Sequence, residues 1–138
     1  YPPFLSSDNN HKIHIYKNNG DKFISNKNLI KTLKIHGLDL KPIYCGGNSN
    51  IMQQREQWTD GANSFALEPG KIICYKCNEY TIKELRKNDY KIISDQEYLE
   101  NYEYYNNSKD KLVITLDSTE LVRGRGGPRC LTLPLLRI

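Results

Sequence analysis

The sequence contains no long hydrophobic run and no repeating pattern of glycine or proline. None of its apolar stretches approaches the roughly 18 residues that a membrane-spanning helix needs. Its 138 residues are 38% hydrophobic, which is too many for a disordered chain. The nine glycines and six prolines follow no period, which excludes a collagen-like structure. A chain of this length forms one domain at most and buries a single core.

The excess of positive charge is small. Twenty basic residues face 16 acidic ones, for a formal net charge of +4, and 14 of the basic residues are lysines spread through an Asn-rich background. Such charge is typical of a solvated surface and is weak evidence for an anionic partner.

A signal peptide is missing from the start of the sequence. Tyr1-Pro2-Pro3 provides neither a basic start nor an apolar stretch. We therefore expect a cytoplasmic protein with four free thiols, at Cys45, Cys74, Cys77 and Cys130. Because no initiator Met is present, we also expect that residue 1 is not the natural start.

The hydrophobic periodicity predicts short strands and short helices in a mixed α/β or α+β unit. Strands are expected at residues 11–16, 40–45, 64–67, 71–75, 90–93, 112–116 and 130–136. The third and fourth of these flank Glu68-Pro69-Gly70 and should form a hairpin.

Helices are expected in three places. The first covers residues 26–36 with Asn26 as its cap, and the other two are opened by capping boxes at residues 81–84 and 94–97. The Tyr- and Asn-rich residues 101–110 are predicted to form a surface loop.

Cys74-Tyr75-Lys76-Cys77 has the C-x-x-C spacing of a redox pair, which requires both sulfurs at a helix N-terminus. The flanking isoleucines favour a strand instead, and residues three apart on a strand point to opposite faces. A redox role is therefore disfavoured, and a zinc site lacks a second ligand pair. The same parity argument makes His11 and His14 surface residues.

The segment Arg123-Gly124-Arg125-Gly126-Gly127-Pro128-Arg129-Cys130 combines three guanidinium groups with one thiol. The positive potential favours the nucleophilic thiolate, and the glycines allow backbone groups to approach a small ligand. Arginine also suits a planar carboxylate. The alternative is an RNA-binding RGG tract or a basic turn, but such tracts usually repeat.

A second dense segment, residues 55–63, reads Arg-Glu-Gln-Trp-Thr-Asp-Gly-Ala-Asn and contains the only Trp. The structural interpretation places Trp58 in the core, with Asp60 and Asn63 bonded to backbone at a tight corner. We favour this interpretation over a catalytic role for the segment.

With these segments the sequence resembles the C-terminal part of arginine deiminase. The resemblance rests on Cys45-Gly46-Gly47, residues 55–63, Pro69-Gly70 and the run Glu-Leu-Val-Arg-Gly-Arg-Gly-Gly-Pro-Arg-Cys at residues 120–130, in that order. It is clear from about Cys45 onward and looser before it. The resemblance implies a five-module α/β propeller of the pentein type, with residues 1–138 as its C-terminal catalytic portion and the upstream modules missing.

The resemblance also implies an activity: hydrolysis of L-arginine to L-citrulline and ammonia, with neither a metal nor an organic cofactor. By position, Cys130 would attack the guanidinium carbon to form a covalent amidino-cysteine. Arg125 would hold the carboxylate of the substrate, and the carbonyl of Gly124 would help to bind it. The implied partner is L-arginine alone, without nucleic acid or membrane, in a full-length homo-oligomer.

One part of the family pattern is missing. The family uses a His-x-Asp pair as part of its proton-transfer machinery, and none of His11, His14 and His36 is followed by Asp two residues later. We expect the general acid/base and the guanidinium-binding carboxylates upstream of residue 1, so that the isolated chain would be inactive. An incomplete propeller would also expose strand edges and self-associate.

Two other functions compete with this reading. The first is a stand-alone, non-catalytic homologue that binds arginine or a partner through the loop around Arg125. The second is an RNA-binding module that uses the same basic loop.

Overall fold

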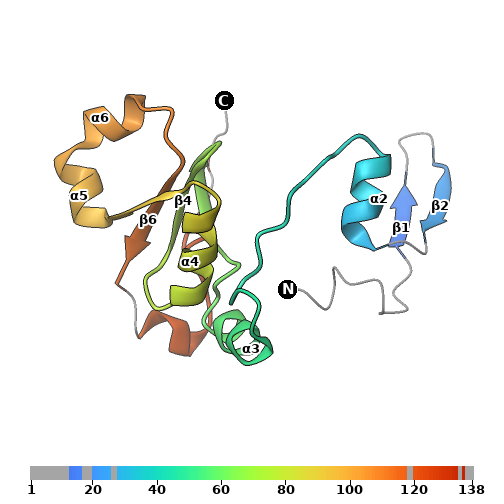
Figure 1. Ribbon diagram of the computed structural model, residues 1–138, viewed down its shortest axis with the longest axis horizontal. Helices are drawn as coiled ribbons and strands as arrows, with labels where there is room; N and C mark the ends of the chain where they lie inside the picture. Colours follow the sequence, from blue (N-terminus) through green and yellow to red (C-terminus); the bar gives the residue numbers. More distant parts are fainter. Residues whose placement is uncertain (1–12, 17–19, 26–27, 118–119, 134, 136–138) are drawn as a thin grey trace. The chain divides into compact units, whose positions relative to one another are not determined.

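The computed structural model describes residues 13–16, 20–25, 28–117, 120–133 and 135 (Figure 1). The chain divides into two compact units, Tyr1–Pro42 and Ile43–Ile138. Each unit is described by itself.

The first unit is a two-stranded hairpin followed by a helix. Strand β1 (Ile13–Tyr16) pairs antiparallel with β2 (Lys22–Ser25). Helix α2 (Leu29–Ile35) is capped by Asn28, whose side chain accepts a hydrogen bond from the Lys31 N–H at 2.9 Å. The expected strand and helix are therefore confirmed, whereas β2 was not predicted. The expected cap, Asn26, lies outside the described residues, as do positions 11 and 12 of the predicted strand.

The second unit is built on a four-stranded mixed sheet in the order β3-β4-β6-β5. Strand β3 (Phe65–Glu68) forms the predicted hairpin with β4 (Lys71–Tyr75). Strands β6 (Leu112–Leu116) and β5 (Lys91–Ser94) continue the sheet in parallel with β4. The mixed α/β class expected from the sequence is confirmed.

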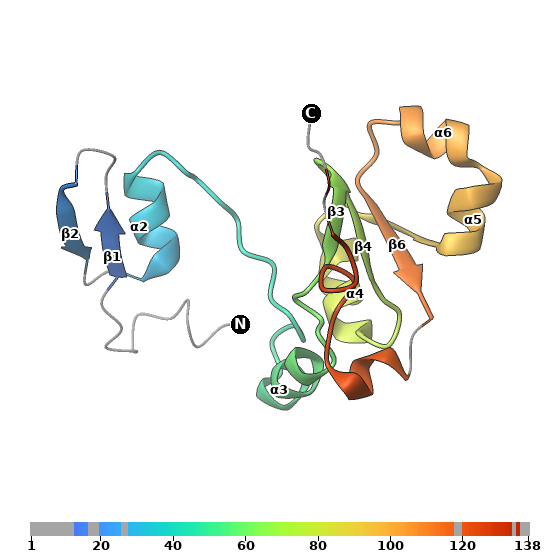
Figure 2. The same ribbon diagram turned by 180° about the vertical axis from the view of Figure 1, so that it is seen from behind.

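The sheet is covered on both faces. On one face, helix α4 (Glu79–Lys87) packs Ile82 and Leu85 against Cys74 and Val113. On the other face, Tyr105 of helix α6 (Tyr102–Asn107) packs in a cluster with Ile93, Leu112 and Ile114. Helix α5 (Asp95–Glu100) connects β5 to α6. Figure 2 shows β3 and β4 in front of α4, the reverse of Figure 1.

Helix α3 (Asn50–Trp58) precedes the sheet, and the short 3-10 helix η1 (Leu121–Gly124) follows it. The two lie side by side at one end of the sheet in both views (Figures 1 and 2). Helix α3 was not predicted, because few of its residues are apolar and its buried positions are polar: Gln53 and Glu56.

Residues 40–45 do not form the predicted strand. They run without regular structure into a turn at residues 45–48, and Leu40 is exposed. The two glycines that follow, Gly46 and Gly47, have positive φ angles, +74° and +66°, so the chain turns where the predicted strand was expected to end. The Gly46 N–H donates to Oγ1 of Thr81 rather than to a neighbouring strand.

One of the two predicted capping boxes is wrong. Thr81 lies inside α4, because the helix begins at Glu79 after Asn78. The carboxylate of Glu56 on α3 accepts hydrogen bonds from the N–H groups of Tyr80 and Thr81, so the first turn is capped from another helix. The cap at Ser94 is confirmed, with its Oγ 3.0 Å from the Glu97 nitrogen.

Residues 101–110 are not simply the predicted surface loop, because α6 forms within them. Its one buried residue, Tyr105, is 4% exposed and explains why the segment folds back onto the sheet. The buried Lys71 Nζ donates to the Asn106 carbonyl at 3.0 Å and fixes the end of this helix to β4. The Tyr- and Asn-rich composition predicts a surface loop, but tyrosine also supplies a large apolar area that can be buried.

The last predicted strand, residues 130–136, is also wrong for the residues that the structure describes. A turn occupies residues 128–131. It is closed by Thr132, whose hydroxyl donates to the Arg129 carbonyl at 2.8 Å. Leu131 and Leu133 are exposed, so the apolar alternation covers no core. Residues 134 and 136 lie outside the described residues.

Candidate active site

The two dense segments of the sequence meet in the fold. Asp60, two residues after the end of α3, accepts a hydrogen bond through Oδ2 from the Gly126 N–H at 2.9 Å. Arg129 donates its N–H to the Asn63 carbonyl at 3.4 Å. The side chain of Asp60 therefore binds backbone, as predicted, although that backbone belongs to the distant Gly-rich loop. The prediction is wrong for the side chain of Asn63, which binds the sulfur of Cys130.

Cys130 lies at the end of this loop with its side chain exposed. Its N–H donates to the Gly127 carbonyl at 2.9 Å, which closes a tight turn. The side-chain amide of Asn63 donates from Nδ2 to the Cys130 sulfur, also at 2.9 Å. This contact ties the sulfur to the corner that follows α3.

Gly127 packs directly against Asn63 where the two segments meet. A Cβ atom at this position would lie 2.5 Å from the Cβ of Asn63 and 2.7 Å from its carbonyl oxygen. No side chain fits in that space, because real Cβ atoms do not come so close. The glycine therefore allows Asn63 to reach the sulfur of Cys130.

Arg125 projects from the loop onto Trp58. Its guanidinium carbon lies 4.4 Å from the centre of the Trp58 ring, which is a cation–π contact. Trp58 is 67% exposed, so the prediction that it fills the core is wrong. Its role in the structure is to present an aromatic face to a guanidinium group.

Gly124 ends η1 and is exposed, and a Cβ placed on it would have no neighbour within 4 Å. Within the described residues, no N–H or O–H group donates to its carbonyl oxygen. The three residues singled out from the sequence, Cys130, Arg125 and Gly124, thus lie on one exposed loop.

Two supporting residues were not predicted. The buried Tyr75 at the end of β4 donates its hydroxyl to the Gly126 carbonyl at 3.0 Å. The carboxylate of Glu56 is 1% exposed and holds the N-terminus of α4, while its carbonyl accepts from the Gly61 N–H at 2.7 Å. No sequence pattern marks either residue, because each acts on a segment distant in the chain.

The other three cysteines are poorly suited to nucleophilic chemistry. Burial raises the pKa of the Cys74 thiol to about 12 and also raises the pKa of Cys45 and of Cys77. The parity argument used for the C-x-x-C motif does not apply, because β4 ends at Tyr75 and Cys77 lies in the following turn. Both cysteines of the motif are free.

The described histidines and acidic residues form no metal site. Among the described residues, no group of three His, Cys, Asp or Glu side chains is placed to hold a metal ion. His14 is exposed as predicted, and so is His36, whereas His11 lies outside the described residues. The described helices are also too short or too polar to cross a membrane.

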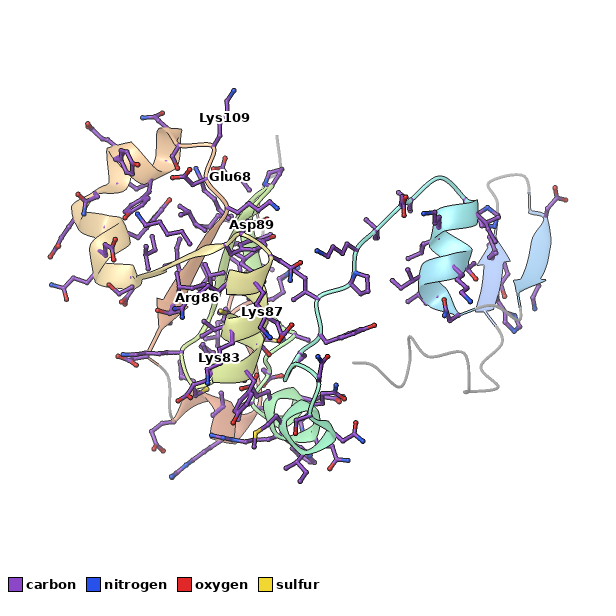
Figure 3. The ribbon with its side chains drawn as sticks, viewed as in Figure 1. Glu68, Lys83, Arg86, Lys87, Asp89 and Lys109 are labelled. Carbon is purple, nitrogen blue, oxygen red and sulfur yellow. The ribbon has the colours of Figure 1, made fainter. Side chains whose placement is uncertain are left out.

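A separate hollow of about 700 Å³ lies between α4 and the turn that precedes α3. Figure 3 labels three cations of α4 that line it, Lys83, Arg86 and Lys87. Two of them already have partners: Lys83 lies 4.7 Å from the centre of the Tyr80 ring, and Lys87 pairs with Glu84 at 2.6 Å. The lining shares no residue with the loop of Cys130.

Comparison with known proteins identifies relatives along nearly the whole chain. A family model described as arginine deiminase matches residues 5–137. The arginine deiminase of Mycoplasma capricolum is 40% identical over 127 residues, which cover 91% of this chain and 26% of that protein. That of Streptococcus agalactiae is 33% identical over 93% of this chain and 25% of its own length.

A third relative, the arginine deiminase of Clostridium perfringens, is 36% identical over 72% of this chain and 19% of its own length. The chain therefore spans about a quarter or less of the length of these curated relatives.

Proposed function

This chain belongs to the arginine deiminase family, and we propose that it supplies the nucleophile for hydrolysis of L-arginine to L-citrulline and ammonia. The observation that carries the proposal is the hydrogen bond from Asn63 to the sulfur of Cys130. It joins the two segments on which the family resemblance rests and places a donor on the one exposed thiol of the chain.

In the proposed reaction the thiolate of Cys130 attacks the guanidinium carbon of L-arginine. An S–C bond forms, and the C–N bond to one terminal nitrogen then breaks, so that ammonia leaves with a proton. Water adds to the carbon of the resulting amidino-cysteine and loses a proton. The new hydroxyl group then loses the second proton of the water as the C=O bond forms and the S–C bond breaks, which releases L-citrulline and regenerates the thiolate.

Arg125 and Gly124 would bind the other parts of the substrate. A guanidinium group can donate two parallel hydrogen bonds to the substrate carboxylate. In the structure this group rests on Trp58, and cation–π contacts at exposed sites are worth only about 0.5–1 kcal/mol. A carboxylate can therefore compete for it. The carbonyl of Gly124, which has no donor among the described residues, would accept a hydrogen bond from the substrate.

The remaining groups are proposed to come from outside residues 1–138. The reaction needs a general acid/base for the departing ammonia and the attacking water, and carboxylates to grip the guanidinium group. No His-x-Asp pair occurs in this chain. We place these groups upstream, in further modules of a five-module α/β propeller whose C-terminal portion is residues 1–138. The length of the relatives, about four times the matched region, supports this arrangement.

The same proposal covers the setting of the enzyme. The full-length protein is a cytoplasmic homo-oligomer that acts on free L-arginine and binds neither nucleic acid nor a membrane. The chemistry described above uses no metal and no organic cofactor.

The decisive experiment uses the full-length protein that contains this chain. After a brief arginine pulse and acid quench, mass spectrometry should find an amidino adduct on Cys130. The Cys130→Ser variant should form neither adduct nor citrulline, because a serine hydroxyl provides almost no anion near neutral pH. Cys77→Ser is the matched control and should retain activity within about tenfold, since this thiol lies outside the site.

Two results would contradict the proposal: an adduct on another cysteine, or citrulline formation by Cys130→Ser. A parent protein that binds arginine without turning it over would instead support the non-catalytic homologue.

A further inference from the structure

The backbone of Gly126 is held on both sides, through its N–H and through its carbonyl, which belong to two successive peptide bonds. Asp60 Oδ2 accepts a hydrogen bond from its N–H at 2.9 Å, and the Tyr75 hydroxyl donates to its carbonyl at 3.0 Å. The two side chains come from different elements, one from the corner after α3 and one from the end of β4. Two independent parts of the fold therefore hold a single residue of the loop.

The residue that is held separates the two functional parts of the loop. Arg125 precedes it and has a φ of +60°, a conformation that a residue with a side chain rarely adopts. The turn from Gly127 to Cys130 follows it. Gly126 itself has a φ of +136°. A Cβ atom placed on Gly126 would lie 3.6 Å from the Cβ of Cys130. Movement of the Gly126 backbone would therefore displace both Arg125 and Cys130.

We infer that Asp60 and Tyr75 are positioning residues, which hold the backbone N–H and carbonyl of Gly126 and thereby place Arg125 against Trp58 and Cys130 against Asn63. The inference rests on the proposed function only for the roles of Arg125 and Cys130 in the reaction. The placement itself is a property of the chain and is measurable without substrate.

The hydroxyl of Tyr75 is suited to this task. The residue is fully buried, and burial raises the pKa of its hydroxyl, with the charges of Asp60 and Cys130 acting in the same direction. The hydroxyl therefore keeps its proton at neutral pH and donates to the carbonyl. Tyr75→Phe removes this donor and leaves the ring in place.

Two substitutions of Asp60 distinguish the effect of its carboxylate from the effect of its backbone conformation. Its φ is +57°, which Gly and Asn adopt more readily than other residues. Asp60→Gly keeps this conformation and removes the acceptor. Asp60→Asn keeps both the conformation and an oxygen that can accept from the Gly126 N–H. This variant is therefore expected to keep the loop in place.

The chain contains its own reporter for Arg125. Trp58 is the only Trp in the sequence, and the Arg125 guanidinium lies over its ring. Trp fluorescence of the 138-residue chain therefore reports whether this contact is kept. Arg125→Ala defines the emission of Trp58 without it. Alkylation of Cys130, followed by peptide mass spectrometry over a range of pH, reports the state of the thiol.

The matched control for Tyr75→Phe is Tyr105→Phe. Tyr105 is also buried, and its hydroxyl donates to Glu97 Oε1 at 2.5 Å, among residues that are not part of the loop. Both variants remove the hydroxyl of a buried tyrosine, and Tyr105→Phe also removes the hydrogen bond that this oxygen accepts from Lys91 Nζ at 3.0 Å, so the control breaks more hydrogen bonds than Tyr75→Phe. Only Tyr75→Phe removes a contact to Gly126.

We expect Tyr75→Phe and Asp60→Gly to move the Trp58 emission toward that of Arg125→Ala and to slow Cys130 alkylation at pH 7.5 about threefold, as the Asn63 contact is lost. Asp60→Asn and Tyr105→Phe should match the parent chain in both readouts. The inference is overturned if Tyr75→Phe leaves both readouts unchanged, or changes them no more than Tyr105→Phe does. Should Asp60→Gly fail to fold, Tyr75→Phe alone decides the matter.

Failure of this inference and failure of the proposed function have different signatures. The fluorescence and alkylation tests involve no arginine, so their outcome does not depend on whether the full-length protein makes citrulline. Conversely, a Cys130→Ser variant that still forms citrulline would refute the nucleophile and leave the placement of the loop intact.

Discussion

The side chain of Asn63 donates a hydrogen bond to the sulfur of Cys130, 67 residues away in the sequence, with 2.9 Å between Nδ2 and Sγ. The contact is possible because Gly127 has no side chain where the two segments cross. It links the only exposed thiol in the described part of the chain to the corner that follows α3.

Replacement of Asn63 should change the reactivity of Cys130 in a graded way. Asn63→Ala removes the donor, and we expect alkylation of Cys130 at neutral pH to slow about two- to fivefold because the contact is partly exposed. Asn63→Asp should slow it more, because a carboxylate beside the sulfur repels the thiolate. Rates measured by peptide mass spectrometry in the 138-residue chain would test this order. Equal rates for the parent chain and the two variants would show that the contact does not affect the reactivity of Cys130.

Two glycines of the loop should differ sharply in their tolerance of alanine. Gly127→Ala should destabilise the unit by about 1–3 kcal/mol, since the new Cβ would overlap Asn63. Gly124→Ala meets no atom within 4 Å and should change stability by less than about 0.5 kcal/mol. Urea unfolding followed by circular dichroism would compare the two. A larger loss for Gly124→Ala would contradict the packing described.

Glu56 should contribute strongly to stability through α4. Its two carboxylate oxygens accept from the N–H groups of Tyr80 and Thr81 and from the Thr81 hydroxyl, at 2.6–2.7 Å. Glu56→Ala leaves these buried donors without a partner and should cost about 3 kcal/mol. Glu56→Gln keeps one acceptor oxygen and should cost less.

The exposed acid Glu100 provides the control for this prediction. Glu100→Gln should change the free energy of unfolding by less than about 0.5 kcal/mol. If Glu56→Ala costs as little as Glu100→Gln in urea unfolding, then Glu56 does not cap α4.

Stability should fall at alkaline pH because of the buried thiol of Cys74. Burial raises its pKa from the ordinary thiol value of 9.0 to about 12, so the unfolded chain ionises this thiol at a lower pH than the folded chain does. Its contribution is fully present below pH 9 and is lost as the pH rises toward 12. The raised pKa values of Cys45, Cys77 and Tyr75 act in the same direction.

Unfolding free energies measured between pH 8 and about 11 should therefore decrease for the parent chain, and Cys74→Ala should show a shallower decrease. An identical slope in the two chains would mean that Cys74 is not protected from ionisation in the folded state.

The local sequence was sufficient to predict the elements whose patterns are local. The hairpin of β3 and β4, strand β6 and the cap at Ser94 each depend on residues within a few positions of one another. The candidate site residues Cys130, Arg125 and Gly124 were proposed in the same way, because they lie in one continuous segment. The family itself could be identified from such segments.

Other features were decided by contacts between distant residues. Helix α4 begins at Glu79 and not at the local capping box, because a carboxylate from α3 satisfies its first N–H groups. Residues 101–110 contain a helix because Tyr105 fills the space beneath the sheet.

The local sequence is sufficient to propose which residues carry the chemistry of this protein, since a thiol, a guanidinium group and glycines occur together in one continuous segment. Their arrangement depends on the tertiary structure. Asn63 reaches Cys130, Trp58 lies under Arg125, and Asp60 and Tyr75 bind the N–H and the carbonyl of Gly126. Hydrogen bonds and ring contacts act over a few ångströms in space. The number of residues between two positions in the sequence therefore does not indicate whether they are in contact.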